Sequence, residues 1–270
     1  VLYDESRKKY VGYWRSSAGR RRSIARSETD DFRRWPLPDI VAHPDGDVPP
    51  TDDYYTNGYS PYPGHDGFHL MFPSIYRRVR DLVEVSMAVS RDGLNWSWPD
   101  RNMVIPAKPP YSGGLYPGPG LLPLSDDRWG LICRAKEALH NEGYYYTPQV
   151  TRGELRWATW TRDQLVGLQA EDRGLVTTNQ MVASGEPLVL NYQTSPNGWI
   201  RVEFIEPTLW PPARLEPNSG FSFDDCEPLR GDELEATVTW NGSSDLSALK
   251  EKNLCLRIEL CQATLFSLTI

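Results

Sequence analysis

The feature that most constrains this chain is a pattern of strand, turn and tryptophan that recurs along its first part. Residues 85–96 read VSMAVSRDGLNW, and alternate positions from Val85 to Val89 are apolar, as in a strand with at least one buried face. The following Asp92-Gly93 favours a tight turn, because Asp can bond its own backbone and Gly tolerates positive φ. Trp96 then supplies a side chain large enough to fill space between layers of sheet.

This unit recurs at a fixed period. Residues 23–35 (SIARSETDDFRRW) have the same order, and residues 155–168 form a weaker copy that has no closing Trp. The strand predicted before each copy places Val11, Met71 and Leu131 60 residues apart. Copies of a multi-strand unit at such a period are typical of β-propeller blades, and a β-sandwich with similar hairpins is the alternative. In a propeller, Trp35 and Trp96 would occupy equivalent places in the core.

The composition agrees with an all-β fold and limits the partners. The chain has 10 Trp and 14 Tyr, while 23 Pro and 21 Gly separate short apolar runs. Its net charge of −7 argues against nucleic acid, and no apolar run reaches the roughly 18 residues of a membrane span. The four cysteines form no CxxC pair, and His65 and His69 have no third ligand nearby, so we expect no metal and no cofactor. The cysteine redox state, the oligomeric state and the choice between cytoplasm and secretion stay open.

A change of pattern near residue 171 predicts two domains. Residues 1–172 are assigned to propeller blades and residues 173–270 to a small β-sandwich of short alternating strands. Within the sandwich, the SPNG sequence at 195–198 is predicted to be a hairpin turn between two strands.

Only three blades are predicted, and a propeller needs at least about four to close. Val1 also begins inside a predicted strand. We therefore expect the chain to be the carboxy-terminal part of a longer protein whose complete propeller has five blades.

Two groups of motifs resemble a known family. Residues 220–270 (GFSFDDCEPLRGDELEATVTWNGSSDLSALKEKNLCLRIELCQATLFSLTI) resemble the end of a group of bacterial proteins in which a GFSxxDC…GD…WxGxSDLSxL pattern closes the chain. The segments ARSETDDFRRW and AVSRDGLNW resemble the blades of the same proteins, which are described as similar to the amino-terminal domain of glycoside hydrolase family 32, the invertase and levanase group. The resemblance covers nearly all of the chain and implies a five-bladed propeller that acts on carbohydrate.

The catalytic motifs of family 32 have no recognisable copy in this sequence. That family carries an Asp nucleophile in a WMNDPNG-like motif, an RDP triplet and an acid/base Glu in an EC pair, and none of these occurs in the chain. The resemblance therefore implies a fold and a substrate class but assigns no catalytic residue.

Candidate site residues come from the predicted entries of the inner strands, because such entries converge on the axis of a propeller. Glycoside hydrolysis needs two carboxyl groups across the scissile bond, a His beside carboxylates can tune a general acid, and tyrosine rings can stack on sugars. On these grounds we assign catalysis to Asp53, Glu137 and His140, and glycan binding to Asp52, Tyr55, Asn57, Glu84 and Tyr116. The alternatives are a solvated acidic turn at 52–53, packed tyrosines, an exposed edge residue at Glu84 and a solvated loop at 135–146.

Two functions are open at this point. The first is a glycosidase-like hydrolase acting on an unidentified glycan at the propeller mouth. The second is a propeller that binds glycans or serves as a scaffold without catalysis. The sugar, its linkage, the stereochemical outcome and the activity of the chain as an enzyme are not determined by the sequence.

Overall fold

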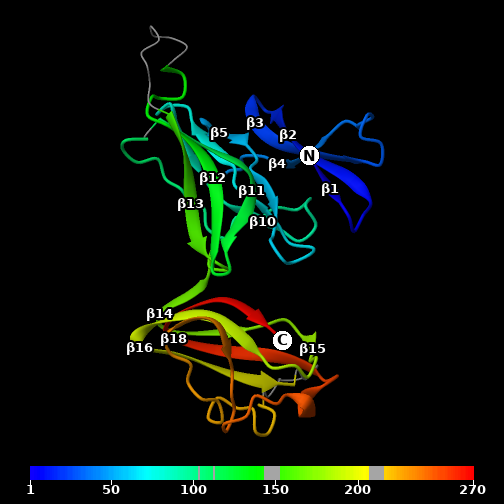
Figure 1. Cartoon of the computed structure of the whole chain (residues 1–270), viewed down its shortest axis with the longest axis vertical. Coiled ribbons are helices and arrows are strands. Elements are labelled where there is room, and N and C mark those ends of the chain that lie inside the picture. The colour runs from blue at the N-terminus through cyan, green and yellow to red at the C-terminus, as the bar shows by residue number, and fades with distance from the viewer. Residues whose placement is uncertain (103, 112, 143–152, 207–215) are drawn as a thin grey trace. The chain divides into compact units, whose positions relative to one another are not determined.

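The computed structural model describes residues 1–270 except positions 103, 112, 143–152 and 207–215. The prediction of an all-β chain is confirmed, since the described strands form four sheets (Figure 1). The chain divides into two compact units, Val1–Thr159 and Trp160–Ile270, which are described separately. The boundary predicted at 172/173 falls inside strand β14 (Leu168–Thr177), which pairs with a single partner strand on both sides of that point.

The first sheet of unit 1 is antiparallel and has the order β1-β2-β3-β4. Its strands are β1 (Leu2–Asp4), β2 (Lys9–Ala18), β3 (Arg21–Thr29) and β4 (Asp39–Ala42). Gly19 and Arg20 both have positive φ, and they form the tight turn between the two long strands. The apolar residues Ile24 and Ala25 are buried in β3.

Three strands that are interrupted in the middle follow in unit 1. Each is divided into two halves: β5 (Asp52–Thr56) and β6 (Tyr59–Pro61), β7 (His69–Met71) and β8 (Ser74–Arg77), and β9 (Leu82–Val85) and β10 (Ala88–Ser90). The halves pair as β5-β8-β9 and β6-β7-β10, and both sets are antiparallel. Bridges from Val85 to Ile105 and from Val89 to Ser97 add an outer edge. These segments therefore form one antiparallel meander.

A third meander completes unit 1 and confirms the repeat. It consists of β11 (Gly114–Ser125), β12 (Arg128–Lys136) and β13 (Gly153–Thr161), in the order β13-β12-β11. A parallel pairing of Gly114 with Val83 joins β11 to β9, so these strands and the set β5-β8-β9 form one six-stranded sheet. Val11, Met71 and Leu131 are all buried, and each lies in the middle strand of its own meander. Their partners in the preceding strand are Leu2, Tyr59 and Leu121. The 60-residue period is therefore structural, although closure of a ring of blades is not detected among the described strands.

Trp35 and Trp96 occupy equivalent turns and neither is fully buried, although Trp96 packs against the core cluster of unit 1. The Trp35 indole N–H donates to the Phe32 carbonyl at 2.8 Å, and that of Trp96 donates to the Gly93 carbonyl at 3.3 Å, three residues back in both cases. Both rings are half-buried. The prediction of equivalent places is confirmed, and that of full burial is wrong, because each indole closes its own turn at the edge of the core. Trp35 packs edge-on against Trp14 and Phe32, and Trp96 packs edge-on against Tyr13 and Tyr59.

Unit 2 is built on one five-stranded sheet. Its strands are β14, β15 (Met181–Val182), β16 (Val189–Ile205), β17 (Asp232–Thr237) and β18 (Asn253–Thr269), in the order β14-β18-β16-β17 with β15 beside β18. The core on one face includes Val202, Phe204 and Ile258, and it is covered by loop residues such as Trp240 and Leu246, near the 3₁₀ turn Ser247–Leu249. The predicted sandwich thus has one regular sheet and, in its described part, a loop-rich opposite layer.

The predicted hairpin at 195–198 is wrong. Residues on both sides of this segment belong to the same strand β16 and pair in sequence with β18: Thr194 with Ala263, and Trp199 with Cys261. Turn-forming residues therefore produce an irregular excursion within one strand, because the long partner β18 continues past it.

Candidate functional site

Five residues of unit 1 form a Tyr–His cluster: Tyr55, Tyr76, Tyr116, His140 and Asn141. The first three lie in β5, β8 and β11, and the other two lie in the loop after β12. The rings of the three tyrosines have centroids 4.7, 4.5 and 5.9 Å from that of His140, in that order. The Tyr116 hydroxyl and His140 Nδ1 share a hydrogen bond of 2.6 Å. The structure thus brings together three of the predicted site residues, namely Tyr55, Tyr116 and His140.

Asp81 holds the loop that carries His140. This residue has a φ of 53° in the turn between β8 and β9. Its carbonyl accepts the His140 N–H at 2.8 Å, and its carboxylate accepts the Asn141 N–H at 2.9 Å and the Asn141 side-chain amide at 2.7 Å. The Tyr76 hydroxyl donates to the same carboxylate at 2.8 Å. Asp81 and Asn141 lie 60 residues apart, so this contact follows the period of the repeat.

Burial decides the protonation of three rings in the cluster, those of His140, Tyr76 and Tyr116. Burial lowers the pKa of His140, and Arg22 and Lys136 also lower it while Asp81 opposes them, so the imidazole is neutral. Burial raises the pKa of Tyr116 and, together with Asp81, raises the pKa of Tyr76 to about 12. Both phenols therefore keep their protons. The Arg22 guanidinium lies over the Tyr55 ring, 4.7 Å from its centroid.

Asp53, one of the three predicted catalytic residues, is a buried ion-pair partner. Only 1% of its surface is exposed. Arg78 donates to both carboxylate oxygens, with Nε at 2.8 Å and Nη2 at 2.5 Å, and the Arg22 backbone N–H adds a bond of 2.9 Å. Burial favours the protonated form of Asp53, but these hydrogen bonds hold its pKa below the ordinary value. The carboxylate is therefore ionised and bound by arginine.

The other predicted site residues lie apart from the Tyr–His cluster. Asp52 and Glu84 both pair with Arg77, and Glu84 does so at 3.2 Å. Asn57 lies between β5 and β6, where its side chain accepts the Tyr59 N–H at 3.0 Å. Glu137 is exposed in the loop after β12, and residues 143–146 of that loop lie outside the described residues. The two carboxyl groups predicted to be catalytic thus differ in setting: Asp53 is buried against Arg78, and Glu137 is exposed.

Arg22, Tyr76 and Asp81 were not predicted as site residues. The period of 60 residues could have identified Asp81, because it lies one period before Asn141. Arg22 and Tyr76 have no comparable signal in the sequence. Arg22 lies in a basic hairpin and Tyr76 in an apolar strand, and these settings alone explain why each residue type occurs there.

A cavity in unit 1, of about 470 Å³, lies beside the turn that precedes Trp96. Its lining includes Tyr62, Phe68, His69, Arg91 and Asn95, and the Arg91 guanidinium stacks on the Phe68 ring at 3.9 Å. The His69 ring shares a hydrogen bond of 2.8 Å with the Tyr59 hydroxyl. Over the described ranges there is no group of three His, Cys, Asp or Glu side chains suited to a metal ion, and no helix long and apolar enough to cross a membrane.

The comparisons with known proteins give distant structural matches only. No family model and no curated protein matches the chain. A candidate glycoside hydrolase from Bacteroides ovatus ATCC 8483 matches with 15% identity and a TM-score of 0.34, over 48% of this chain and 43% of that one. The exo-inulinase from Aspergillus awamori matches with 11% identity and a TM-score of 0.35, over 98% and 94% of the two chains. The match thus spans less than half the length of the first of these structures.

Proposed function

We propose that this chain is the glycan-binding part of a glycosidase-like, carbohydrate-active protein. In this proposal the three meanders of unit 1 are blades of a five-bladed propeller, and the Tyr–His cluster contacts the sugar. One observation carries the proposal: tyrosines from three strands of two meanders converge on His140, within 6 Å of its ring.

The chemistry of the cluster suits a neutral sugar. Aromatic rings offer apolar faces to the C–H groups of a pyranose or furanose ring, while phenols, amides and imidazoles exchange hydrogen bonds with its hydroxyls. Tyr55 and His140 are both partly exposed, as a contact surface requires. Their neutral, protonated neighbours Tyr76 and Tyr116 supply hydroxyl groups that can both donate and accept.

Binding rather than hydrolysis is the function that these residues support. Hydrolysis requires one ionised and one protonated carboxyl group facing the glycosidic bond. Asp53 is ionised, bound by Arg78 and only 1% exposed, so it has no proton to give and its oxygen atoms are closed to a substrate. Glu137 is exposed in the loop after β12, three residues before His140.

The test is calorimetric titration of the whole chain with fructan, cello-, xylo- and malto-oligosaccharides, accompanied by an assay for released sugar. Tyr55→Ala and His140→Ala should each weaken binding of the preferred sugar at least tenfold, because each removes a ring from the contact surface. Tyr3→Ala, at an exposed ring of β1, is the control and should leave the affinity unchanged. Absence of sugar binding, or equal binding by all variants, would refute the proposal. Sugar release that Glu137→Gln abolishes would instead support the hydrolase.

A further inference from the structure

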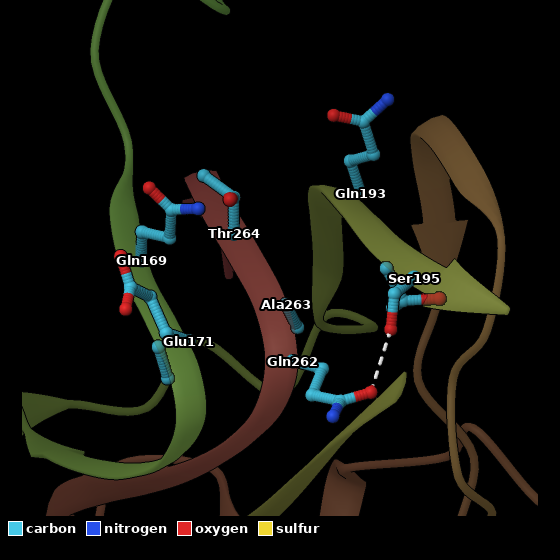
Figure 2. A pocket seen from close by; sticks show the side chains of 9 residues that line it. Gln169, Glu171, Gln193, Ser195, Gln262, Ala263 and Thr264 are labelled. Carbon is cyan, nitrogen blue, oxygen red and sulfur yellow. Dashed lines mark hydrogen bonds between the residues drawn. The ribbon is translucent and has the colours of Figure 1, made fainter. Parts of the chain in front are cut away.

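Unit 2 contains a cavity of about 410 Å³ that the proposed function does not use (Figure 2). Three adjacent strands, β14, β18 and β16, line it. Its polar lining residues are Gln169, Glu171, Gln193, Thr194, Ser195, Gln262 and Thr264. Figure 2 shows the Ser195 hydroxyl directed at the Gln262 side chain, to which it donates at 3.0 Å. We refer to this feature as the polar sheet cavity.

The strand register explains why these side chains share one face of the sheet. Thr264 in the central strand pairs with Gln169 on one side and with Gln193 on the other, so the three residues form a row across three strands. Cross-strand neighbours point to the same face, and the next residue points to the opposite one. That next residue, Ala263, is only 4% exposed and belongs to the core. The polar row therefore lies on the face that is turned away from the core.

The sheet is irregular on both sides of the cavity. The pairing of β14 with β18 shifts between Ala170 and Arg173, and that of β16 with β18 shifts between Thr194 and Trp199. Between the two shifts, Gln262 has a φ of 46°, in the left-handed region that favours glycine. Two irregularities at one place, with a strained residue between them, are typical of bulges that redirect side chains beside a binding site.

Gly198 allows the close approach that this bulge needs. A Cβ atom at this position would lie 2.4 Å from the carbonyl oxygen of Gln262, a distance that forbids any larger residue without movement of backbone. The excursion at 195–198 in β16 and the bulge at Gln262 in β18 therefore lie in direct backbone contact.

The lining selects the class of ligand. Three amides and three hydroxyls supply both donors and acceptors, Glu171 supplies an acceptor-only carboxylate, and none of the described lining residues is Lys, Arg or His. Such a set disfavours an anion, and an apolar ligand would meet only Ala170 and Ala263. The volume lies within the range of about 300–1,000 Å³ found for small-molecule sites.

We propose that the polar sheet cavity is a second carbohydrate site, which binds a neutral saccharide through the amide row and Glu171. A carboxylate can accept hydrogen bonds from two adjacent sugar hydroxyls, and side-chain amides can bridge the donor and acceptor of neighbouring hydroxyls. This site is independent of the Tyr–His cluster, since it is built from other residues of the other unit.

The experiment is calorimetric titration of the whole chain with fructo-, cello-, xylo- and malto-hexaose. The double variant Gln169→Ala, Gln193→Ala should weaken binding of the preferred hexaose at this site at least tenfold. Both side chains are exposed, so the variant should fold normally. Gln180→Ala, an exposed glutamine of the same unit outside the cavity lining, is the matched control and should leave the affinity unchanged.

Variants of the two proposed sites separate the two proposals. If Tyr55→Ala removes all saccharide binding and the double glutamine variant removes none, the second site is refuted while the proposed function stands. If only the double glutamine variant loses binding, the second site stands and the Tyr–His cluster is refuted. An extended Gly-Ser peptide, which offers backbone amides in place of sugar hydroxyls, is the further probe. The inference would also be overturned if this peptide bound and no hexaose did, or if neither kind of probe bound.

Discussion

Asp53 lies in β5 with its carboxylate held by two nitrogen atoms of Arg78, and this contact decides the role of the residue. A carboxyl group near the start of a predicted inner strand has the sequence context of a catalytic acid. The partner that neutralises it lies 25 residues away, in the turn after β8, and nothing in the local sequence of either residue identifies the pair. At the residue scale, the sequence therefore predicts part of the set of side chains that lie together, such as Tyr55, Tyr116 and His140. It does not predict which carboxyl groups are neutralised by a distant arginine.

The Asp53–Arg78 pair should be a substantial contributor to the stability of unit 1. In Arg78→Met a buried carboxylate loses its main partner, and we expect the free energy of unfolding to fall by about 3 kcal/mol. Arg101→Met is the matched control, because Arg101 pairs with Asp45 at the surface and should contribute less than about 1 kcal/mol. Urea unfolding of both variants measures the difference. Equal losses in the two variants would show that burial of Asp53 has no energetic consequence.

The same pair predicts a dependence of stability on pH. Because the folded-state pKa of Asp53 lies below its ordinary value of 3.8, its contribution is complete above that pH and is lost as the pH falls through the folded-state pKa. Between about pH 5 and pH 2 the wild-type chain should therefore lose more stability than Asp53→Asn. Thermal unfolding at a series of pH values tests this, and parallel curves for the two proteins would count against it.

At the scale of elements, local pattern and long-range pairing have separate roles. Alternating apolar residues predict the middle strands that contain Val11, Met71 and Leu131, because burial of one strand face leaves its mark in a few consecutive residues. The excursion at 195–198 has the residues of a hairpin turn, yet its outcome depends on β18, some 60 residues later. Sequence periodicity thus predicts strands, and it cannot predict the partner that converts a turn into a bulge.

Gln262 offers a direct measure of what the bulge in β18 costs. Glycine adopts a φ of 46° without strain and glutamine adopts it at a cost, so Gln262→Gly should raise the free energy of unfolding by about 0.5–1 kcal/mol. Thr264→Gly, two residues on in regularly paired strand, is the control and should lower it by about 1 kcal/mol. Chemical denaturation of the two variants makes the comparison. A loss of stability in Gln262→Gly would mean that the side-chain contacts of Gln262 contribute more than its backbone strain costs.

At the scale of the whole molecule, each unit has its own hydrophobic core. One cluster of buried residues lies entirely within unit 2, and another, around Tyr54 and Met71, lies entirely within unit 1. The change of pattern near residue 171 predicts two domains because strand composition alters there. The strand at that point, β14, pairs with β18, so the described separation between the units lies earlier, at Thr159 and Trp160.

We therefore expect a fragment of residues 160–270 to fold on its own. It keeps β14 to β18 and all of the core cluster of unit 2, so the apolar burial that stabilises this unit is complete in the fragment. Calorimetry of the fragment should show one cooperative transition, at a temperature within a few degrees of one of two transitions in the whole chain. A fragment that begins at residue 173 is the control, since it cuts β14 in half and should unfold at a lower temperature. A single transition in the whole chain, together with an unfolded 160–270 fragment, would show that the two units fold as one.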